Sequence, residues 1–284
     1  MRNYRYIGVR PLAGALGAEI DGIDLSEDLG TDVFAEIKQA FLDHLVVFFR
    51  DQDITPAQQV AFARRFGGIH LHPYMRGLPE QPEVLEIRKE PDDTYTFGSV
   101  WHTDQMFNPQ PAMATMLYAH EVPPYGGDTM FANMYLALER LSPAMQAMLA
   151  GQRSHCVGDT PGKAGSRADR YGGKTSMATN LQERADPITA EHPLVRTHPE
   201  TGRRSLYIGV HVQRLAGMTE AESGPLLGFL REHATKPEFT CRFRWAPGSL
   251  ALWDNRCTQH YAVPDYQGQR RRMHRVTIEG DRPA

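Results

Sequence analysis

The sequence predicts a single domain, residues 1–284, that is mainly β-structure with helices outside a β core. Two observations favour this fold class. Turn residues such as Pro247-Gly248 and Gln267-Gly268 divide the C-terminal region, 239–278, into short apolar segments typical of strands. Helical periodicity is confined to a few separated segments. A hydrophobic fraction of 41% supplies a core for one unit of this length.

The first two thirds of the chain supply the flanking helices and the opening strands. Loose alternation of apolar and polar residues predicts the opening strands. The apolar run Leu45–Phe49 predicts a strand that is buried on both faces. Thr55-Pro56-Ala57-Gln58 and Thr219-Glu220-Ala221-Glu222 are capping boxes, which mark helix starts. Strands are expected at 6–9, 18–25 and 45–49, and helices at 31–44, 56–66, 136–149 with a break at Ser142-Pro143, and after Thr219.

The segment Gly158–Asn180 combines five glycines with basic residues and shows little apolar periodicity. One interpretation is a mobile surface loop. The other is a mobile lid over a substrate, spanning 158–192, because the segment lies between the two halves of the site predicted below. The residues leave both open.

Composition excludes several classes of protein. A net charge of −3 and a pI near 6.5 give no electrostatic footprint for nucleic acid. No apolar signal segment opens the chain, and no apolar run is long enough to cross a bilayer. The three cysteines (Cys156, Cys241 and Cys257) form no C-x-x-C pair, which fits a reducing compartment. We therefore expect a cytoplasmic protein without a membrane partner.

Two histidines and a carboxylate are the strongest chemical signal. His102 and Asp104 in Trp101-His102-Thr103-Asp104 point the same way in an extended segment, and His260 lies far downstream. Two imidazoles and one carboxylate leave positions open on an octahedral metal, as in non-haem Fe(II) oxygenases. Cys257, at an odd offset from His260, is expected to be a buried inert thiol and not a ligand.

Two arginines near the C-terminus predict an anion site. In a strand leading into Val276-Thr277-Ile278, Arg271 and Arg275 share one face with Met273. This alternation places two guanidinium groups inside the core, where each needs an anion. In Gly126-Gly127-Asp128-Thr129 the glycines predict a tight turn, and the Thr129 hydroxyl is a donor suited to the same carboxylate.

These strings resemble the Fe(II)/2-oxoglutarate-dependent dioxygenases of the taurine dioxygenase and aryloxyalkanoate dioxygenase (TauD/TfdA) family. The resemblance extends over nearly the whole chain. It implies a double-stranded β-helix (jelly-roll) core. The matching strings are Leu16-Gly17-Ala18-Glu19-Ile20, Trp101-His102-Thr103-Asp104, Gly126-Gly127-Asp128-Thr129, Trp253-Asp254-Asn255-Arg256, Thr258-Gln259-His260-Tyr261 and Arg271–Arg275.

The resemblance also implies roles for particular residues. His102, Asp104 and His260 would bind Fe(II), while Thr129 and Arg271 would hold 2-oxoglutarate. Arg275 and His72 would contact a small anionic organic substrate. The implied reaction consumes O2, hydroxylates a C–H bond and yields succinate and CO2, with collapse of some hydroxylated products to a carbonyl. The family also suggests a homodimer or homotetramer. Halogenases lack the carboxylate that Asp104 supplies, so halogenation is disfavoured.

The sequence departs from the taurine enzymes at three places, one of which is the segment Gly158–Asn180. Gly98 stands where they have an asparagine, and Gly209-Val210-His211 replaces a Gly-Phe pair. These differences argue against taurine. An aryloxyalkanoate-type carboxylate is favoured instead by the resembling strings that begin at Tyr125, Lys236 and Tyr261, with an organosulfonate or alkyl sulfate as the alternative. His211 is expected to be a strand histidine in preference to a pocket contact. Two rival functions are a non-catalytic jelly-roll module that binds an anion or metal, and a zinc hydrolase.

Overall fold

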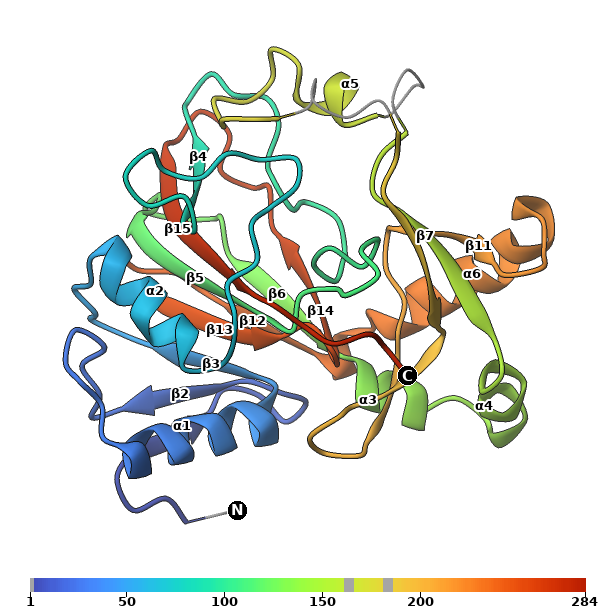
Figure 1. The fold of residues 1–284 in the computed structure, drawn as a ribbon, viewed down its shortest axis with the longest axis horizontal. Helices are drawn as coiled ribbons and strands as arrows, with labels where there is room; N and C mark the ends of the chain where they lie inside the picture. Colours follow the sequence, from blue (N-terminus) through green and yellow to red (C-terminus); the bar gives the residue numbers. More distant parts are fainter. Residues whose placement is uncertain (1–2, 161–165, 181–185) are drawn as a thin grey trace.

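The computed structural model describes residues 3–160, 166–180 and 186–284. A seven-stranded sheet, which we call the major sheet, forms its centre with the order β1-β2-β3-β13-β5-β15-β4 (Figure 1). Its neighbours are antiparallel except for β2 and β3. The strands are β1 (Gly8–Pro11), β2 (Ala18–Asp21), β3 (Val46–Phe49), β4 (Leu85–Lys89), β5 (Ala114–Glu121), β13 (Leu250–Asp254) and β15 (Arg271–Ile278).

Two helices cover the outer face of the major sheet, α1 (Thr31–His44) and α2 (Pro56–Arg64). The α2 helix begins at the predicted capping box, in which Thr55 and Gln58 bond each other's backbone N–H groups. Successive residues of β3 alternate between the two faces of the sheet. Val47 and Phe49 pack under the helices, whereas Val46 and Phe48 face the interior. The predicted burial of this strand on both faces is therefore confirmed.

A smaller sheet, β12-β6-β14, packs against the inner face of the major sheet. Its strands are β6 (Thr129–Asn133), β12 (Thr240–Phe243) and β14 (Thr258–Ala262). Aromatic rings join the two layers, with Phe48 stacked on Phe243 at 4.0 Å between centroids and Phe131 against Trp253 at 5.6 Å. Two facing antiparallel sheets around one core form the predicted jelly-roll.

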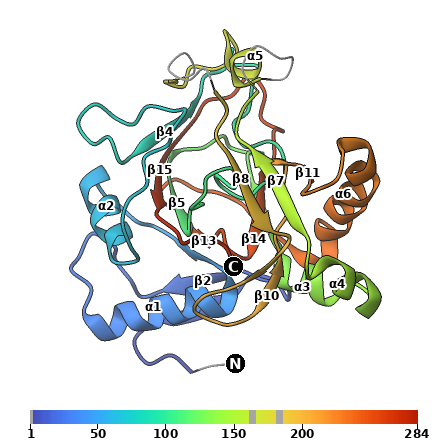
Figure 2. The ribbon, with the colours of Figure 1, turned by 45° about the vertical axis from the view of Figure 1, so that its right-hand side comes forward.

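A third layer flanks one side of this sandwich (Figure 2). Its strands, in the order β11-β7-β8, pack with helices into a second hydrophobic cluster. The elements are β7 (Arg153–Val157), β8 (Thr189–Pro193), β11 (Val212–Leu215), the pair β9 (Val195–Thr197) and β10 (Arg204–Leu206), α3 (Met134–Glu139), α4 (Pro143–Leu149), α6 (Glu220–Ala234) and the 3-10 turn η2 (Pro237–Phe239).

The short helix α5 (Arg167–Tyr171), which lies between β7 and β8 in the sequence, sits at the open end of the sandwich (Figures 1 and 2). The predicted lid, 158–192, includes 161–165 and 181–185, which lie outside the described residues. The sequence indicated no helix in this segment, so α5 is a correction. Movement of the lid remains a prediction.

Several boundaries differ from the expected ones. The second strand ends at Asp21 and not at residue 25, α2 ends at Arg64 and not at residue 66, and α3 begins at Met134 and not at residue 136. Leu45 is not the first strand residue but the C-cap of α1, in the left-handed region at φ 67°. The first strand covers 8–11 instead of 6–9, because its register is set by pairing with β2. No helix within the described ranges is long and apolar enough to cross a membrane.

A buried histidine on β15 should make stability depend on pH. His274 contacts His120 at 2.8 Å between ring nitrogens, and burial lowers the pKa of His274 to about 4. The unfolded chain therefore binds more protons between about pH 6.5 and 4, so stability falls as the pH falls through this window. The expected loss is of the order of 2–3 kcal/mol.

Chemical denaturation of wild type and His274→Asn at several pH values checks this expectation. The variant should lose less stability than wild type between pH 6.5 and 4, as the titrating group is gone. His155→Gln, on the partly exposed β7, is the matched control and should keep the wild-type dependence. Equal pH dependence in wild type and His274→Asn would contradict the prediction.

Candidate active site

His102 and His260 are brought together by the backbone. The segment that carries His102 pairs with β14 at these two residues, with reciprocal N–H···O bonds of 3.1 and 2.9 Å. Asp104 Oδ1 lies 3.7 Å from Nε2 of each histidine. The three ligand atoms fall within 4.8 Å of one another, and all three side chains are buried. The structure thus assembles the predicted triad between the two sheets.

Hydrogen bonds fix the direction of the triad side chains. The backbone carbonyl of Val100 accepts from His102 Nδ1 at 2.7 Å, which leaves Nε2 unprotonated and free to bind a cation. The Thr115 hydroxyl donates to Asp104 Oδ2 at 2.6 Å, so Oδ1 is the oxygen that faces the histidines. Asn255 holds both Thr115 and Asp104 in place. Its Nδ2 donates to the Thr115 hydroxyl, and its Oδ1 accepts from the Asp104 backbone N–H.

The electrostatics of the triad suit a cation. Burial lowers the pKa of His102 and, more strongly, of His260, so both imidazoles are neutral. Burial alone would raise the pKa of Asp104, but the Arg275 guanidinium, 2.9 Å from Oδ1, and the two histidines hold it well below its usual range. Neutral imidazoles and an ionised carboxylate are the forms that bind a metal.

The bond from Thr115 should contribute to metal affinity. Thr115→Val keeps the side-chain shape but removes the donor to Asp104 Oδ2, so the carboxylate loses its fixed orientation. We expect metal affinity to fall by about 10- to 100-fold. Thr240→Val is the control. It removes a hydroxyl on β12 that donates a hydrogen bond to the Pro237 carbonyl. Titration of each variant with Co(II) or Mn(II) measures the effect, and unchanged affinity in Thr115→Val would contradict it.

A second group of residues lines the cavity beside His260. Arg271 is 4% exposed, and its Nε and Nη2 atoms have no acceptor among the described residues. The rings of Trp245 and Tyr266 lie 5.8 and 5.9 Å from this guanidinium. Thr129 lines the same cavity, and its hydroxyl accepts from Trp245 Nε1 at 3.0 Å, so its own proton is available to a ligand. Buried donors without acceptors call for an anion.

The residues present fit both groups that the resemblance implies. A nitrogen, nitrogen and oxygen donor set suits Fe(II) with open positions. The unpaired donors of Arg271, with the Thr129 hydroxyl, suit one carboxylate of a dicarboxylic acid that reaches the triad. Arg271 and Arg275 both line the cavity next to His102 and His260, as the strand alternation predicted.

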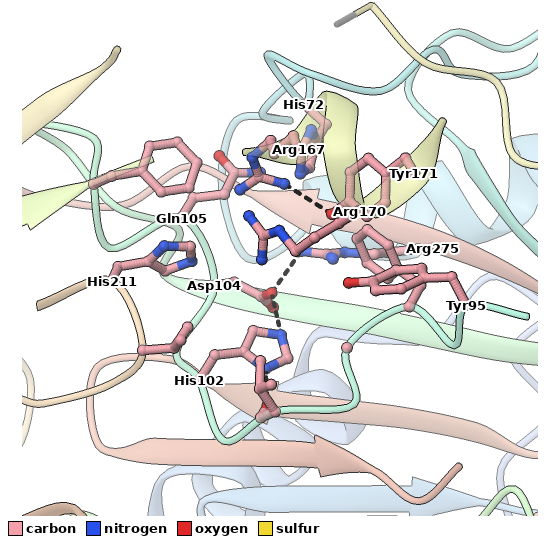
Figure 3. A pocket seen from close by; sticks show the side chains of 15 residues that line it. His72, Tyr95, His102, Asp104, Gln105, Arg167, Arg170, Tyr171, His211 and Arg275 are labelled. Carbon is pink, nitrogen blue, oxygen red and sulfur yellow. Dashed lines mark hydrogen bonds and ion pairs between the residues drawn. The ribbon is translucent and has the colours of Figure 1, made fainter. Parts of the chain in front are cut away.

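Above the triad, a pocket is lined by residues from several elements (Figure 3). Both predicted substrate residues lie here. Arg275 pairs with Asp104, and His72 accepts from the Tyr74 backbone N–H at 3.1 Å. Burial and the charge of Arg275 lower the pKa of His72 well below its usual value. Gly98, at φ +79°, also lines the pocket, and an added Cβ would sit 3.4 Å from the His102 ring.

His211 is not an ordinary strand histidine, and that expectation was wrong. It lies just before β11, lines the pocket and packs edge-on against Phe107 at 4.9 Å between ring centroids. Burial lowers its pKa to about 3, so the ring is neutral. The backbone turns at Gly209 and Val210 before the strand begins, and this turn directs the ring towards the triad.

Sequence reasoning also missed several pocket residues. Arg167, Arg170 and Tyr171 come from α5, and Tyr95 and Phe107 complete the wall. Glycines around α5 hid its short helical turn. One usable signal was Ser166-Arg167-Ala168-Asp169, an N-cap pattern in which the Ser166 hydroxyl accepts from the Asp169 N–H.

A second cluster that resembles a ligand set consists of His198, Asp254 and Cys257. Its carboxylate is already occupied. Arg256 donates to both Asp254 oxygens at 2.8 and 2.7 Å, and His198 Nε2 donates to Oδ2 at 2.9 Å. Burial raises the pKa of Cys257 well above its usual value, so the thiol stays protonated. This cluster is a structural hydrogen-bond network, and Cys257 fits its predicted inert role.

A jelly-roll that presents two histidines and a carboxylate beside a buried arginine with two unpaired donor atoms has the features of non-haem iron oxygenases. Comparison with known proteins agrees. A family model described as taurine catabolism dioxygenase TauD, TfdA family matches residues 8–277, and the chain belongs to this family. The predicted family, jelly-roll class and oxidoreductase activity are thereby confirmed.

Individual relatives cover almost the whole chain. An alkylsulfatase of Acinetobacter baylyi is 35% identical over 281 residues, which cover 96% of this chain and 85% of the relative. An (S)-phenoxypropionate/alpha-ketoglutarate-dioxygenase of Sphingobium herbicidovorans is 34% identical over 277 residues, covering 96% and 95%. The crystal structure of a taurine dioxygenase from Burkholderia xenovorans aligns with a TM-score of 0.83 at 38% identity, covering 99% and 91%.

Proposed function

We propose that this enzyme hydroxylates a C–H bond of a small anionic substrate, with Fe(II), 2-oxoglutarate and O2 as reactants. When bound, these three supply the oxidant that removes hydrogen from carbon, and 2-oxoglutarate leaves as succinate and CO2. The observation that carries the proposal is the buried Arg271, whose Nε and Nη2 donors lack an acceptor within the described chain, beside the assembled triad. Neither a zinc hydrolase nor a passive metal-binding module needs such a group.

Each site residue has a defined part in this proposal. His102, Asp104 and His260 hold the metal, and Thr115 and Val100 keep them oriented. Arg271 and Thr129 bind the distal carboxylate of 2-oxoglutarate. Arg275, which lies 2.9 Å from Asp104 Oδ1, would bind the anionic group of the substrate. His72 and His211, both neutral, contribute hydrogen bonds that aim the C–H bond without adding charge.

The substrate class follows from the charge of the pocket and from the relatives. The named relatives act on sulfate esters and phenoxypropionate, which are organic anions. We propose an aryloxyalkanoate-type carboxylate or an organosulfonate or alkyl sulfate for this chain. Hydroxylation at the carbon that bears the oxygen or sulfonate gives a product that collapses to a carbonyl, with the phenol, sulfate or sulfite released as the leaving group. We also propose that the 158–192 segment closes over this pocket, so that water is excluded during the reaction.

The location and assembly of the enzyme are further parts of the proposal. Three free, buried cysteines support a reducing compartment such as the cytoplasm. A homodimer or homotetramer is proposed from the family resemblance, and size-exclusion chromatography with light scattering measures it.

Succinate formation tests the proposed reaction. Purified protein with Fe(II), 2-oxoglutarate and O2 is incubated with alkyl sulfates, alkyl sulfonates and aryloxyalkanoates in turn. Succinate release that depends on one anion class, together with an equal amount of oxidised substrate, supports the proposal and identifies the class. Folded protein that binds metal but fails to bind 2-oxoglutarate in anaerobic calorimetry would overturn it in favour of the non-catalytic alternative.

A further inference from the structure

The helix α5 adds two cationic side chains to the substrate pocket. Arg167 and Arg170 extend from α5 towards Asp104 and Arg275, and Tyr171 lies beside them (Figure 3). Asp104 is the one carboxylate among the described residues that line this pocket. Three guanidinium groups therefore face a single carboxylate, and the metal would take up the charge of that carboxylate.

Arg167 is held rigidly and has no acidic partner. It is 5% exposed, its Nε donates to the Gly158 carbonyl at 2.9 Å and its Nη1 donates to the Tyr171 hydroxyl at 3.1 Å. Its guanidinium lies 4.5 Å from the centroid of the Tyr74 ring. The nearby Asp159 carboxylate accepts from the backbone N–H groups of Thr160 and Arg167 instead. A buried cation in this position is costly unless an anion joins it.

Arg170 is half-buried and likewise has no acidic partner among the described residues. Its Nε is buried without an acceptor, and no carboxylate of the described chain lies within ion-pair distance of either α5 arginine. The histidines of the pocket add no charge to this balance, because burial keeps His72 and His211 neutral. A substrate with one negative charge satisfies Arg275 and leaves the α5 arginines unpaired.

We infer that the preferred substrate is a dianion, with one negative charge bound by Arg275 and the second by Arg167 and Arg170 of α5. This inference rests on the proposed function and specifies its substrate class further. Arg167 and Arg170 are then specificity-determining residues. Two chemical forms carry the required charge, a chain with an anionic group at each end and a chain with one doubly charged head.

The experiment measures substrate binding by anaerobic calorimetry to the full chain loaded with Fe(II) and 2-oxoglutarate. The probes are hexyl sulfate, the same chain with a terminal carboxylate, and hexyl phosphate above its second pKa. We expect at least one dianion to bind wild type about 10-fold or more tightly than hexyl sulfate. The carboxylated chain reports charges at two ends, and the phosphate reports a doubly charged head.

Variants connect this preference to α5. Arg170→Gln should lower the affinity for the preferred dianion by about 10-fold and the affinity for hexyl sulfate by less than about 3-fold. Arg167→Gln should act similarly, and Arg170→Lys should restore part of the preference. Because Arg167 also bonds Gly158, the half-buried Arg170 provides the test that does not depend on the fold of this turn. Arg153→Gln, on the exposed side of β7, is the control.

The outcomes separate the two proposals. Equal binding of monoanion and dianion by wild type, or equal weakening of both by Arg170→Gln, overturns the dianion inference while the proposed function stands. Binding of 2-oxoglutarate before substrate is added is scored separately, and its failure counts against the proposed function and not against the charge of the pocket.

Discussion

Asp104→Ala is expected to abolish substrate-dependent succinate formation, with a loss of about 10³-fold or more. Asp104 is the proposed acidic ligand of the triad, and its Oδ1 lies 3.7 Å from each histidine Nε2. Two neutral imidazoles alone bind a divalent metal too weakly to hold it during turnover. The substitution also leaves Arg275 without its carboxylate partner, so the fold of the variant is checked by circular dichroism.

Asp104→Asn separates loss of charge from loss of shape. The amide oxygen can still accept from Thr115, so the local packing is kept while the negative charge is removed. We expect Asp104→Asn to fold like wild type and to lose metal affinity and activity nearly as far as Asp104→Ala. Asp281→Asn, at a half-exposed acidic residue that pairs with Arg196, is the matched control and should stay active. Activity of either Asp104 variant near the wild-type level at limiting Fe(II) would contradict the ligand role.

Local patterns were sufficient to predict much of the fold. Helix α1 has the predicted bounds because its apolar spacing and its end at His44 are both local features. The two capping boxes start α2 and α6 at the expected residues for the same reason. The interior face of β15 was also predictable, since strand alternation fixes which residues accompany Arg271.

Local patterns could not predict which residues far apart in the sequence lie next to each other. The bridge between His102 and His260 depends on how the two sheets fold over each other, and nothing near either residue specifies that register. The family resemblance supplied this contact, and the structure supplies its geometry. The network from Asn255 through Thr115 to Asp104 was missed for the same reason, because its members come from separate strands and loops.

The α5 segment shows a different limit. Arg167 is placed by contacts with Gly158 and the Tyr74 ring, whereas the glycines around α5 gave no indication of a helix. Short helices held by tertiary contacts have weak local signals. The misassignment of His211 has the same origin, since the turn before β11 and not the strand determines where its ring lies.

Arg271→Ala is expected to raise the 2-oxoglutarate requirement by about 10²-fold, while the maximal rate at saturating 2-oxoglutarate changes less. The guanidinium is buried, its Nε and Nη2 atoms lack acceptors in the described part of the chain, and a bidentate pair with a carboxylate stabilises the complex by about 3 kcal/mol. Arg270→Ala is the matched control, because the Arg270 side chain is next in sequence but exposed, and it pairs with Glu90 and Glu121.

The Arg271 comparison also tests the face assignment of β15. Arg270 and Arg271 are adjacent in sequence, but Arg270 precedes β15 and is exposed, whereas Arg271 begins the strand and is buried. Anaerobic calorimetry with 2-oxoglutarate should show a weak complex for Arg271→Ala and wild-type affinity for Arg270→Ala. Arg271→Lys keeps the charge but loses the planar fork, so its affinity should fall between the two. If Arg271→Ala binds 2-oxoglutarate like wild type, the co-substrate carboxylate lies elsewhere. The buried donors of Arg271 in the wild-type protein would then serve another anion.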